Sequence, residues 1–473
     1  MMLGMVAAED LSDAERRVWD AFPTGQLVDF GTGNAEDDDP AGGEGWGPDR
    51  QVRAEVLAAL LCGAVEVEPG HVGEVYLHRA RITGALRLPG ATFKYRLRLN
   101  ECYVPDGIDL ADATTRTLDL SGCRVGAIRI ERTEIDGVFR LNRVRLEGTG
   151  GGPALTGQDL TVTGDMFCTR GFQVAGKVDL TSASIGGDLD LDGAHLDGKG
   201  GGALDGQDLN VTGNMFCTGG FQAAGEVNLT TASIGGDLDL DGAHLDGKGR
   251  GALRGRGLTV TGSLYCRGGF QAVGMVYLSG AKVGKLEDDK ESWPQALHID
   301  GLTYGDLAYL PARERLGWLN RSVGYWPQPY EQLAGYYRRL GHDEQARRVL
   351  LVKQRQRRRQ RPWWARWWGW LQDALAGYGY APGRALLLLA GAFVAGWLVF
   401  RAHQPVPVGP GPHPTFNAAL YTLDVLIPAP ALGLASDFDP QGVGLVVAAG
   451  LHILGWLLAI TVIAAITRAF SRT

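Results

Sequence analysis

A near-literal repeat of 49 residues constrains the fold of this chain more than any other feature of its sequence. The segment that begins at Gly157 returns at Gly206, and a third, more diverged copy begins at Gly255. Apolar and polar residues alternate within each copy, so that in residues 188–192 the leucines share one face of a strand and the aspartates the other. Short strands of this kind, separated by glycine turns, bury an apolar face only when they wind into stacked coils. A helical repeat is excluded, because no stretch of the repeat keeps a helical period.

The pattern resembles the pentapeptide-repeat β-solenoids of bacteria, although the five-residue rule is degenerate here. At roughly 20 residues per coil, the 49-residue unit would hold two coils and an insertion. Gly-rich insertions begin at Leu146, Leu196 and Leu245, and we expect them to project from one side of the solenoid as a surface for a protein partner. We therefore predict a mainly β fold. It is a right-handed, pentapeptide-repeat-like β-solenoid with N-terminal helices as a cap, followed by a helical hairpin and two transmembrane helices.

Four regions follow from these patterns. They are an N-terminal helical cap (residues 1–62), the β-solenoid (63–295), a helical hairpin with a basic linker (296–362), and a tryptophan belt with a two-span membrane domain (363–473).

Helix signals flank the solenoid on both sides. Ser12 and Glu15 form a capping box before a short helix, and a second helix, from about residue 50 to 61, is expected to cover the open end of the solenoid. The C-terminal hairpin begins at Tyr330 and turns at Gly341. A stripe of apolar residues should join its two helices; it consists of Leu333, Ala334, Tyr337 and Ala346.

Charge is distributed unevenly along the chain. Residues 148–250 contain 14 acidic and 5 basic residues, whereas residues 353–366 contain seven basic residues and no acidic one. The acidic block invites comparison with pentapeptide-repeat proteins that imitate DNA, but those proteins are soluble. We expect the basic block to bind anionic lipid headgroups, because tryptophans and an apolar segment follow it directly. Nucleic acid is not an expected partner.

Arginines and tryptophans indicate a membrane interface before two apolar segments. Tryptophan suits the headgroup level, because its ring is partly apolar and partly polar. The apolar segments are residues 385–400 and 443–466, and the second is long enough for a hydrocarbon core of ~30 Å. The expected interface residues are Lys353, Arg355, Arg357, Arg358, Arg359, Arg361, Trp363, Trp364, Trp367 and Trp368.

Basic residues lie before the first apolar segment and after the second, as Arg468 and Arg472. We expect the chain to cross the bacterial inner membrane twice. By the positive-inside rule, both termini and the solenoid then lie in the cytoplasm. No secretory signal peptide is visible at the start of the sequence.

The order of these regions resembles a group of actinobacterial membrane proteins that are often labelled membrane-associated oxidoreductases. The motifs that carry the resemblance are the solenoid, "YEQLA…YRRLG…ARRVL" from Tyr330, the arginine–tryptophan belt, and "FNAALYTLDVLIPAPALGL" from Phe416. The resemblance covers nearly the whole chain and implies a membrane protein. It brings no catalytic motif that could be assigned to residues of this chain.

Motifs for nucleotide or calcium binding are incomplete. Residues 198–203 come closest to a dinucleotide fingerprint, but more strand follows them where a helix is required. Asp188, Asp190 and Asp192 match the first half of a calcium loop, yet Lys199 stands where a bidentate glutamate belongs. We therefore expect no cofactor or metal and interpret the aspartates as a solvated strand face.

Cysteines and histidines recur with the repeat. Cys168, Cys217 and Cys266 share one register, and a separation of two coils, about 9–10 Å, is too long for a disulfide. We expect them to be inert. His195 and His244 lack partners for a catalytic triad and are expected in turns.

Asp424 raises one alternative function. It lies between the two apolar segments, in a stretch that Pro428 and Pro430 interrupt, so an oligomeric pore could place a ring of its carboxylates in a re-entrant segment. A channel filter motif is missing. The sequence favours a membrane-anchored binding or assembly scaffold without catalytic activity, with the oligomeric pore and the oxidoreductase as alternatives.

Overall fold

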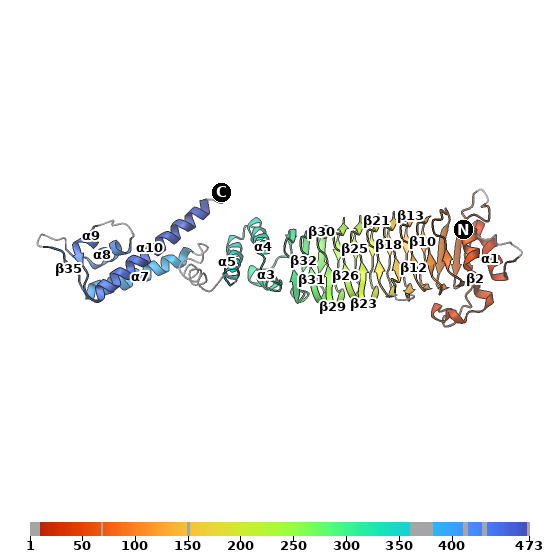
Figure 1. Cartoon of the computed structure of the whole chain (residues 1–473), viewed down its shortest axis with the longest axis horizontal. Coiled ribbons are helices and arrows are strands. Elements are labelled where there is room, and N and C mark those ends of the chain that lie inside the picture. Colours follow the sequence, from red (N-terminus) through yellow and green to blue (C-terminus); the bar gives the residue numbers. More distant parts are fainter. Residues whose placement is uncertain are drawn as a thin grey trace. The chain divides into compact units, whose positions relative to one another are not determined.

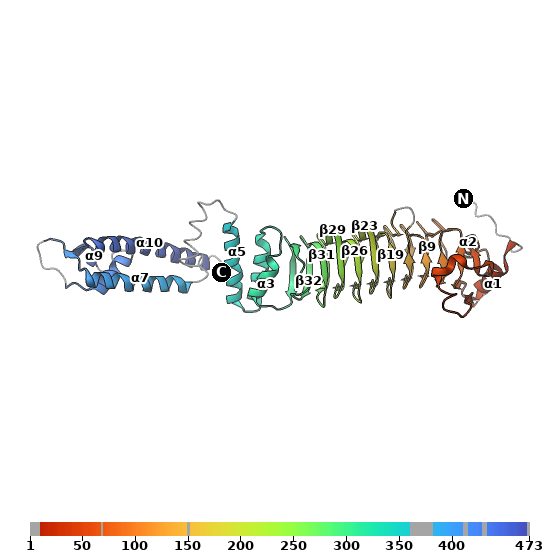
Figure 2. The same ribbon diagram turned by 90° about the horizontal axis from the view of Figure 1, so that it is seen from below.

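A computed structural model describes residues 10–67, 70–148, 152–359, 382–409, 415–427 and 433–470. The chain divides into two compact units, Met1–Pro329 and Tyr330–Thr473. The first is a parallel β-solenoid of about ten coils with helices at both ends, and the second is helical (Figures 1 and 2).

Two parallel sheets run the length of the solenoid, and most of their strands are only two residues long. The described strands of the first sheet are β1 (Val28–Asp29), β3 (Glu74–His78), β6 (Arg96–Asn100), β9 (Thr114–Thr115), β10 (Leu118–Asp119), β13 (Glu134–Ile135), β14 (Phe139–Arg140), β17 (Thr161–Val162), β18 (Met166–Phe167), β21 (Ser184–Ile185), β22 (Leu189–Asp190), β24 (Asn210–Val211), β25 (Met215–Phe216), β27 (Ser233–Ile234), β28 (Leu238–Asp239), β30 (Thr259–Cys266), β32 (Lys282–Asp288) and β34 (Thr303–Leu307).

The described strands of the second sheet are β2 (Gln51–Arg53), β4 (Arg81–Thr83), β5 (Leu86–Arg87), β7 (Tyr103–Val104), β8 (Ile108–Asp109), β11 (Arg124–Val125), β12 (Ile128–Arg129), β15 (Arg145–Leu146), β16 (Leu155–Thr156), β19 (Gln173–Ala175), β20 (Val178–Asp179), β23 (His195–Asp205), β26 (Gln222–Asn228), β29 (His244–Arg254), β31 (Gln271–Tyr277) and β33 (Ala296–His298).

Strand register explains the 49-residue repeat. Met166 pairs with Leu189, and Leu189 pairs with Met215, so successive coils advance by 23 and 26 residues and two coils make one repeat. The prediction of a β-solenoid with two coils per repeat is confirmed. Leu189 and Leu191 are buried in its core, as the alternation predicts, because every second residue of a strand points inward.

The Gly-rich insertions lie inside two long strands rather than between strands, although their central residues, 198–201 and 247–250, pair with no described strand. Residues 198–202 lie inside β23, which pairs with β26 on both sides of a register shift between Asp197 and Leu204. Lys199 and Gly200 have positive φ angles, so the chain makes a tight excursion and returns to the ladder. The copy in β29 does the same, with a shift between Asp246 and Leu253. Of the insertion after Leu146, residues 149–151 lie outside the described residues.

At the N-terminal end, α1 (Asp13–Ala21) begins with the predicted capping box of Ser12 and Glu15. The second helix, α2 (Ala54–Leu61), starts later than expected, because residues 51–53 pair as β2 with β4. Val56, Leu57 and Leu60 of α2 are buried at this end of the solenoid. Three short 3-10 helices complete the cap: η2 (Phe22–Thr24), η3 (Pro40–Gly45) and η4 (Pro48–Arg50).

Strand pairing continues past residue 295 through β33 and β34, and a helix then closes the other end. In this helix, α3 (Ala312–Leu319), the buried Arg315 donates to both carboxylate oxygens of Asp288 at 2.6 and 2.8 Å. Sequence reasoning missed this cap, because Arg315 reads as a surface residue in a short helix.

The second unit contains the predicted hairpin. Its helices are α4 (Pro327–Arg339) and α5 (Asp343–Arg359), Gly341 between them has a φ of +77°, and the predicted stripe is buried. The other described elements are α7 (Pro382–Ala402), β35 (Val406–Pro407), α8 (Ala418–Leu426), α9 (Leu434–Asp437), β36 (Phe438–Asp439) and α10 (Val443–Phe470). None of the helices in the described part of the chain is long and apolar enough to cross a membrane.

Candidate functional site

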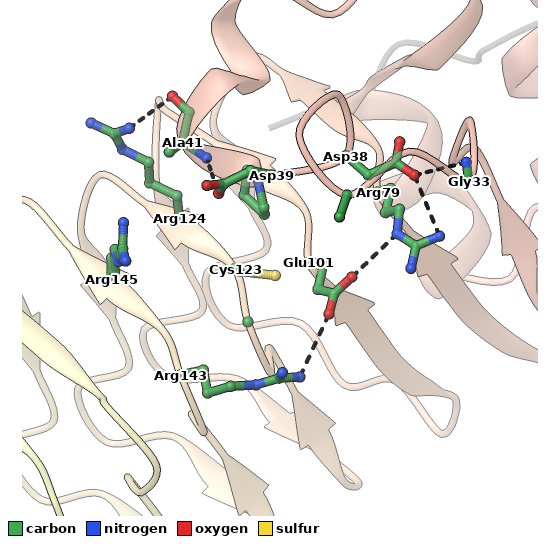
Figure 3. Close-up of a pocket in the computed structure, with 13 residues that line it drawn as sticks. Gly33, Asp38, Asp39, Ala41, Arg79, Glu101, Cys123, Arg124, Arg143 and Arg145 are labelled. Carbon is green, nitrogen blue, oxygen red and sulfur yellow. Dashed lines mark hydrogen bonds and ion pairs between the residues drawn. The ribbon is translucent and has the colours of Figure 1, made fainter.

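A cavity of about 460 Å³ lies between the N-terminal segment and the first coils of the solenoid. Figure 3 shows that charged side chains from both parts surround it. The lining residues are Gly33, Ala35, Asp38, Asp39, Pro40, Ala41, Arg79, Glu101, Gly122, Cys123, Arg124, Arg143 and Arg145. We call this cavity the arginine pocket.

One wall of the arginine pocket is held in place by Asp38. Its carboxylate accepts the backbone N–H groups of Thr32 and Gly33 at 2.9 and 3.0 Å, and Arg50 donates to it at 3.1 Å. Burial raises the pKa of Asp38, but these N–H groups and the charges of Arg50 and Arg79 outweigh it and lower the pKa below its usual value. Asp38 therefore stays ionised and fastens the loop to the solenoid.

Glu101 organises the opposite wall. Its carboxylate accepts a hydrogen bond from Arg79 Nε at 3.2 Å and lies 3.6 Å from Arg143 Nη2 (Figure 3). Gly122 belongs to the coil between the one that carries Glu101 and the one that carries Arg143. A Cβ atom at Gly122 would come within 2.9 Å of Glu101 Cγ. The glycine therefore leaves the space that the Glu101 side chain needs to reach Arg143 across this coil.

Arg124 and Arg145 are register partners on neighbouring strands β11 and β15. Paired strands lie about 4.8 Å apart, so two like charges stand side by side. Arg124 is partly neutralised, because it pairs with Glu147 and donates to the carbonyl oxygen of Ala41 at 3.0 Å. Arg145 is exposed and forms no ion pair with any described residue. The pocket therefore offers guanidinium groups that its own carboxylates leave incompletely compensated.

Cys123 contributes no reactive thiolate to the pocket. It is buried, and burial raises its pKa well above the usual value. The backbone N–H of Cys102 lies 3.3 Å from its sulfur. These two cysteines occupy neighbouring coils, a pairing that the 49-residue register of Cys168, Cys217 and Cys266 did not suggest.

The aspartates of the calcium-like motif bind backbone instead. Asp188 accepts the N–H of Asn214 at 2.7 Å, and Asp192 accepts the N–H and hydroxyl of Thr218 at 2.8 and 2.7 Å. Each of these carboxylates thus fixes the coil that follows it. Within the described residues, no group of three or more potential metal-binding side chains comes together.

His195 and His244 form part of an exposed column on the second sheet, rather than turns. The register pairs each histidine with glutamines of the neighbouring coils, in the order Gln173, His195, Gln222, His244 and Gln271. Among the described residues, no carboxylate and hydroxyl lie together with either histidine in the manner of a triad.

The predicted membrane-interface residues are described only in part. Lys353 forms an ion pair with Glu331 of the hairpin, Arg355 is half-buried and Arg357 is exposed. Arg358 and Arg359 lie on α5. The others lie outside the described residues; they are Arg361, Trp363, Trp364, Trp367 and Trp368.

Asp424, the predicted pore residue, is buried in α8. Its Oδ2 accepts the N–H of Ala435 at 2.8 Å, next to a core that contains Phe400, Tyr421 and Leu451. Within this unit the carboxylate joins α8 to α9.

Sequence reasoning missed the arginine pocket. One available signal was the spacing of 21 residues from Arg124 to Arg145, which is one coil. No comparable signal existed for the loop that carries Asp38, because residues 31–47 are polar and Gly-rich and looked like a linker. Its fold and this pocket define the chain as a parallel β-solenoid with an arginine pocket at the N-terminal end.

Comparisons with protein-family models, with curated proteins and with solved structures found no match to this chain.

Proposed function

We propose that this chain is a non-catalytic binding scaffold and that its arginine pocket binds an anionic group of the phosphate class. The observation that carries the proposal is the set of guanidinium groups of Arg124, Arg143 and Arg145 around one cavity, with Arg145 lacking an ion pair among the described residues. Planar guanidinium groups bind phosphate and carboxylate oxygens in pairs, and such charge-assisted hydrogen bonds are stronger than neutral ones.

The ordered walls support binding rather than simple surface charge. Asp38 and Glu101 hold Arg79 from two sides, at 3.7 and 3.2 Å. A preorganised site loses less conformational entropy on binding than a flexible one. Arg143 and Arg145 remain open to an incoming oxyanion, because both side chains are exposed.

We further propose that the second unit attaches the scaffold to the inner face of the cytoplasmic membrane, as the apolar segments and the basic cluster of the sequence predict. Large apolar side chains on α7 and α10 are exposed, among them Leu387 (75%), Val446 (72%) and Ile453 (62%). An exposed apolar surface of this kind needs a lipid or protein partner. Reporters fused before Met1 and after Thr473 should both read as cytoplasmic. An outward signal from either would refute this attachment and the two membrane spans that the sequence predicts.

Calorimetric titration of the full chain with inorganic phosphate and pyrophosphate tests the pocket. We expect Arg143→Ala and Arg145→Ala each to weaken pyrophosphate binding about tenfold or more, because a hydrogen bond to a charged group contributes roughly 1.5–3 kcal/mol. Arg129→Ala is the matched control: its side chain is 55% exposed, close to the 58% of Arg143, but it pairs with Asp109 and Glu131 away from the pocket.

Vesicles that contain phosphatidic acid distinguish a lipid headgroup from a soluble phosphate. Binding to vesicles that is lost in Arg145→Ala, without binding of pyrophosphate, assigns the pocket to lipid. Equal affinities for wild type, Arg145→Ala and Arg129→Ala would refute the pocket as the binding site.

A further inference from the structure

A column of outward-facing residues on the first sheet alternates between aromatic rings and charged groups. Each residue pairs in register with the next across neighbouring coils, at a spacing of about 4.8 Å. We call this the aromatic–acid column, and its members run from β14 to β30 through Arg140, Phe167, Asp190, Phe216, Asp239 and Tyr265. In Figure 1 its labelled strands β18, β25 and β30 run from the central part of the solenoid towards the end near α3.

The chain places an arginine over the rings on both sides of Phe216. The guanidinium carbon of Arg140 lies 5.8 Å from the ring centre of Phe167, and that of Arg267 lies 4.6 Å from the ring centre of Tyr265. Further along the same register, Arg98 lies 3.9 Å from the ring centre of Tyr76. Phe216 is partly exposed, and no described cation stands over its ring.

Two carboxylates flank this uncovered ring. Asp190 precedes Phe216 by one coil and Asp239 follows it by one coil. Each accepts the backbone N–H of the residue two positions later in its own coil, at 3.0 and 2.9 Å, and neither forms an ion pair with a described residue. Burial raises the pKa of both, and neighbouring aspartates raise them further. Arg267 lowers the pKa of Asp239 in part, but its direct ion pair is with Asp241, at 2.8 Å.

We propose that Phe216, Asp190 and Asp239 form a docking slot for an arginine side chain of a basic partner protein. A guanidinium group stacked on the Phe216 ring would lie between the two carboxylates and could donate to both. Arginine fits better than lysine, because its planar group stacks on a ring while its N–H groups point outward in the ring plane. The rings of Phe167 and Tyr265 in this column, and that of Tyr76 further along the register, show that the fold accommodates an arginine over a ring.

Charge complementarity favours a protein segment over a free cation. The neighbouring columns add Asp188 and Asp237 on one side and Asp192 on the other, so the slot lies in an acidic field that extends over several coils. An extended basic segment would keep one arginine in the slot and place other cations along this field.

The probe is a fluorescent peptide with four arginines separated by pairs of glycines, titrated with the full chain and followed by anisotropy. Matched peptides replace arginine by lysine or by the neutral citrulline. We expect the arginine peptide to bind several-fold more tightly than the lysine peptide and the citrulline peptide to show no binding. Phe216→Leu should weaken arginine-peptide binding about fivefold to tenfold, in the range of a cation–π contact that is partly shielded from water.

Phe167→Leu is the matched control, because Arg140 already occupies its ring, and we expect it to change affinity less than twofold. Should Phe216→Leu lower the melting temperature strongly, the double change Asp190→Asn and Asp239→Asn takes its place with the same expected loss. Equal binding of the arginine and lysine peptides, unchanged by Phe216→Leu, would refute the slot and leave only general attraction to acidic columns. Concentration-dependent self-association that Phe216→Leu abolishes, without peptide binding, would refute a foreign partner and assign the slot to an arginine of a second copy.

Discussion

Replacing Glu15 by glutamine tests how the N-terminal cap is fastened to the solenoid and therefore how the loop of the arginine pocket is supported. Glu15 is buried between α1 and β2. Its Oε1 accepts the backbone N–H of Arg53 at 3.0 Å and Arg53 Nε at 2.7 Å, and its Oε2 accepts Ser12 N–H and Arg53 Nη2, both at 2.9 Å. Glutamine keeps the shape but loses the charge and one acceptor.

The magnitude follows from the pKa of Glu15. Burial raises the pKa, but the hydrogen bonds from Arg53 and Ser12 and the charge of Arg53 outweigh it and lower the pKa from 4.5 to about 2. This difference corresponds to roughly 3 kcal/mol of the free energy of unfolding. Because the Arg53 side chain is 42% exposed, solvent screening reduces the expected contribution to about 1.5–2 kcal/mol.

The pH dependence has a definite sign. Glu15 has a lower pKa in the folded state than in the unfolded state, so its contribution is complete above about pH 4.5 and is lost as the pH falls towards 2. We expect Glu15→Gln to melt several degrees below wild type at pH 7, and the two proteins to converge near pH 2–3. Asp13→Asn, an exposed change in the first turn of the same helix, is the control and should differ little from wild type. A Glu15→Gln defect of the same size at every pH would refute the electrostatic account.

Three further changes test the core, the thiols and the second unit. Leu191→Asp should cost several kcal/mol and abolish cooperative unfolding, because it places a carboxylate among buried apolar side chains, whereas Asp190→Asn should be mild; equal melting temperatures for the two variants would contradict the register. Iodoacetamide should label the exposed Cys62 quickly and buried thiols such as Cys123 only after unfolding, as peptide mass mapping can show; rapid labelling of Cys123 would contradict its burial. Asp424→Ala should destabilise the second unit by about 1–2 kcal/mol in detergent, because it removes the acceptor of the Ala435 N–H; an unchanged melting temperature would mean that this hydrogen bond contributes nothing.

The solenoid could be predicted because its information is local and repeated. Period-two alternation fixes which residues point inward, and an offset of 49 residues fixes how coils stack, so Leu189 could be placed in the core from sequence alone. The start of α2 could not, because residues 51–53 become a strand only by pairing with residues 81–83. A pairing over 30 residues leaves no trace in the local pattern.

The arginine pocket escaped prediction for a related reason. Its loop is held by Asp38, whose partner Arg50 is near in sequence, but Arg79 joins it only through the winding of the chain. Glycines and acidic residues in this loop have the composition of a linker. Composition cannot show that a carboxylate will be buried and will accept two backbone N–H groups.

At one corner of the repeat, some coils carry a charged residue where other coils have glycine, and the stability of the fold alone does not explain this choice. At one corner of the solenoid, successive coils hold a residue with positive φ, and the later coils use glycine, such as Gly242 at +70°. The early coils mix glycine, as at Gly122 (+74°), with charged residues; these are Arg79 (+58°), Glu101 (+52°), Arg143 (+59°) and Arg170 (+55°). A non-glycine residue in this region costs roughly 1 kcal/mol, so these positions are less stable than glycine would make them. Arg79, Glu101 and Arg143 line the arginine pocket, and the charge that they bring there is the property that glycine cannot supply.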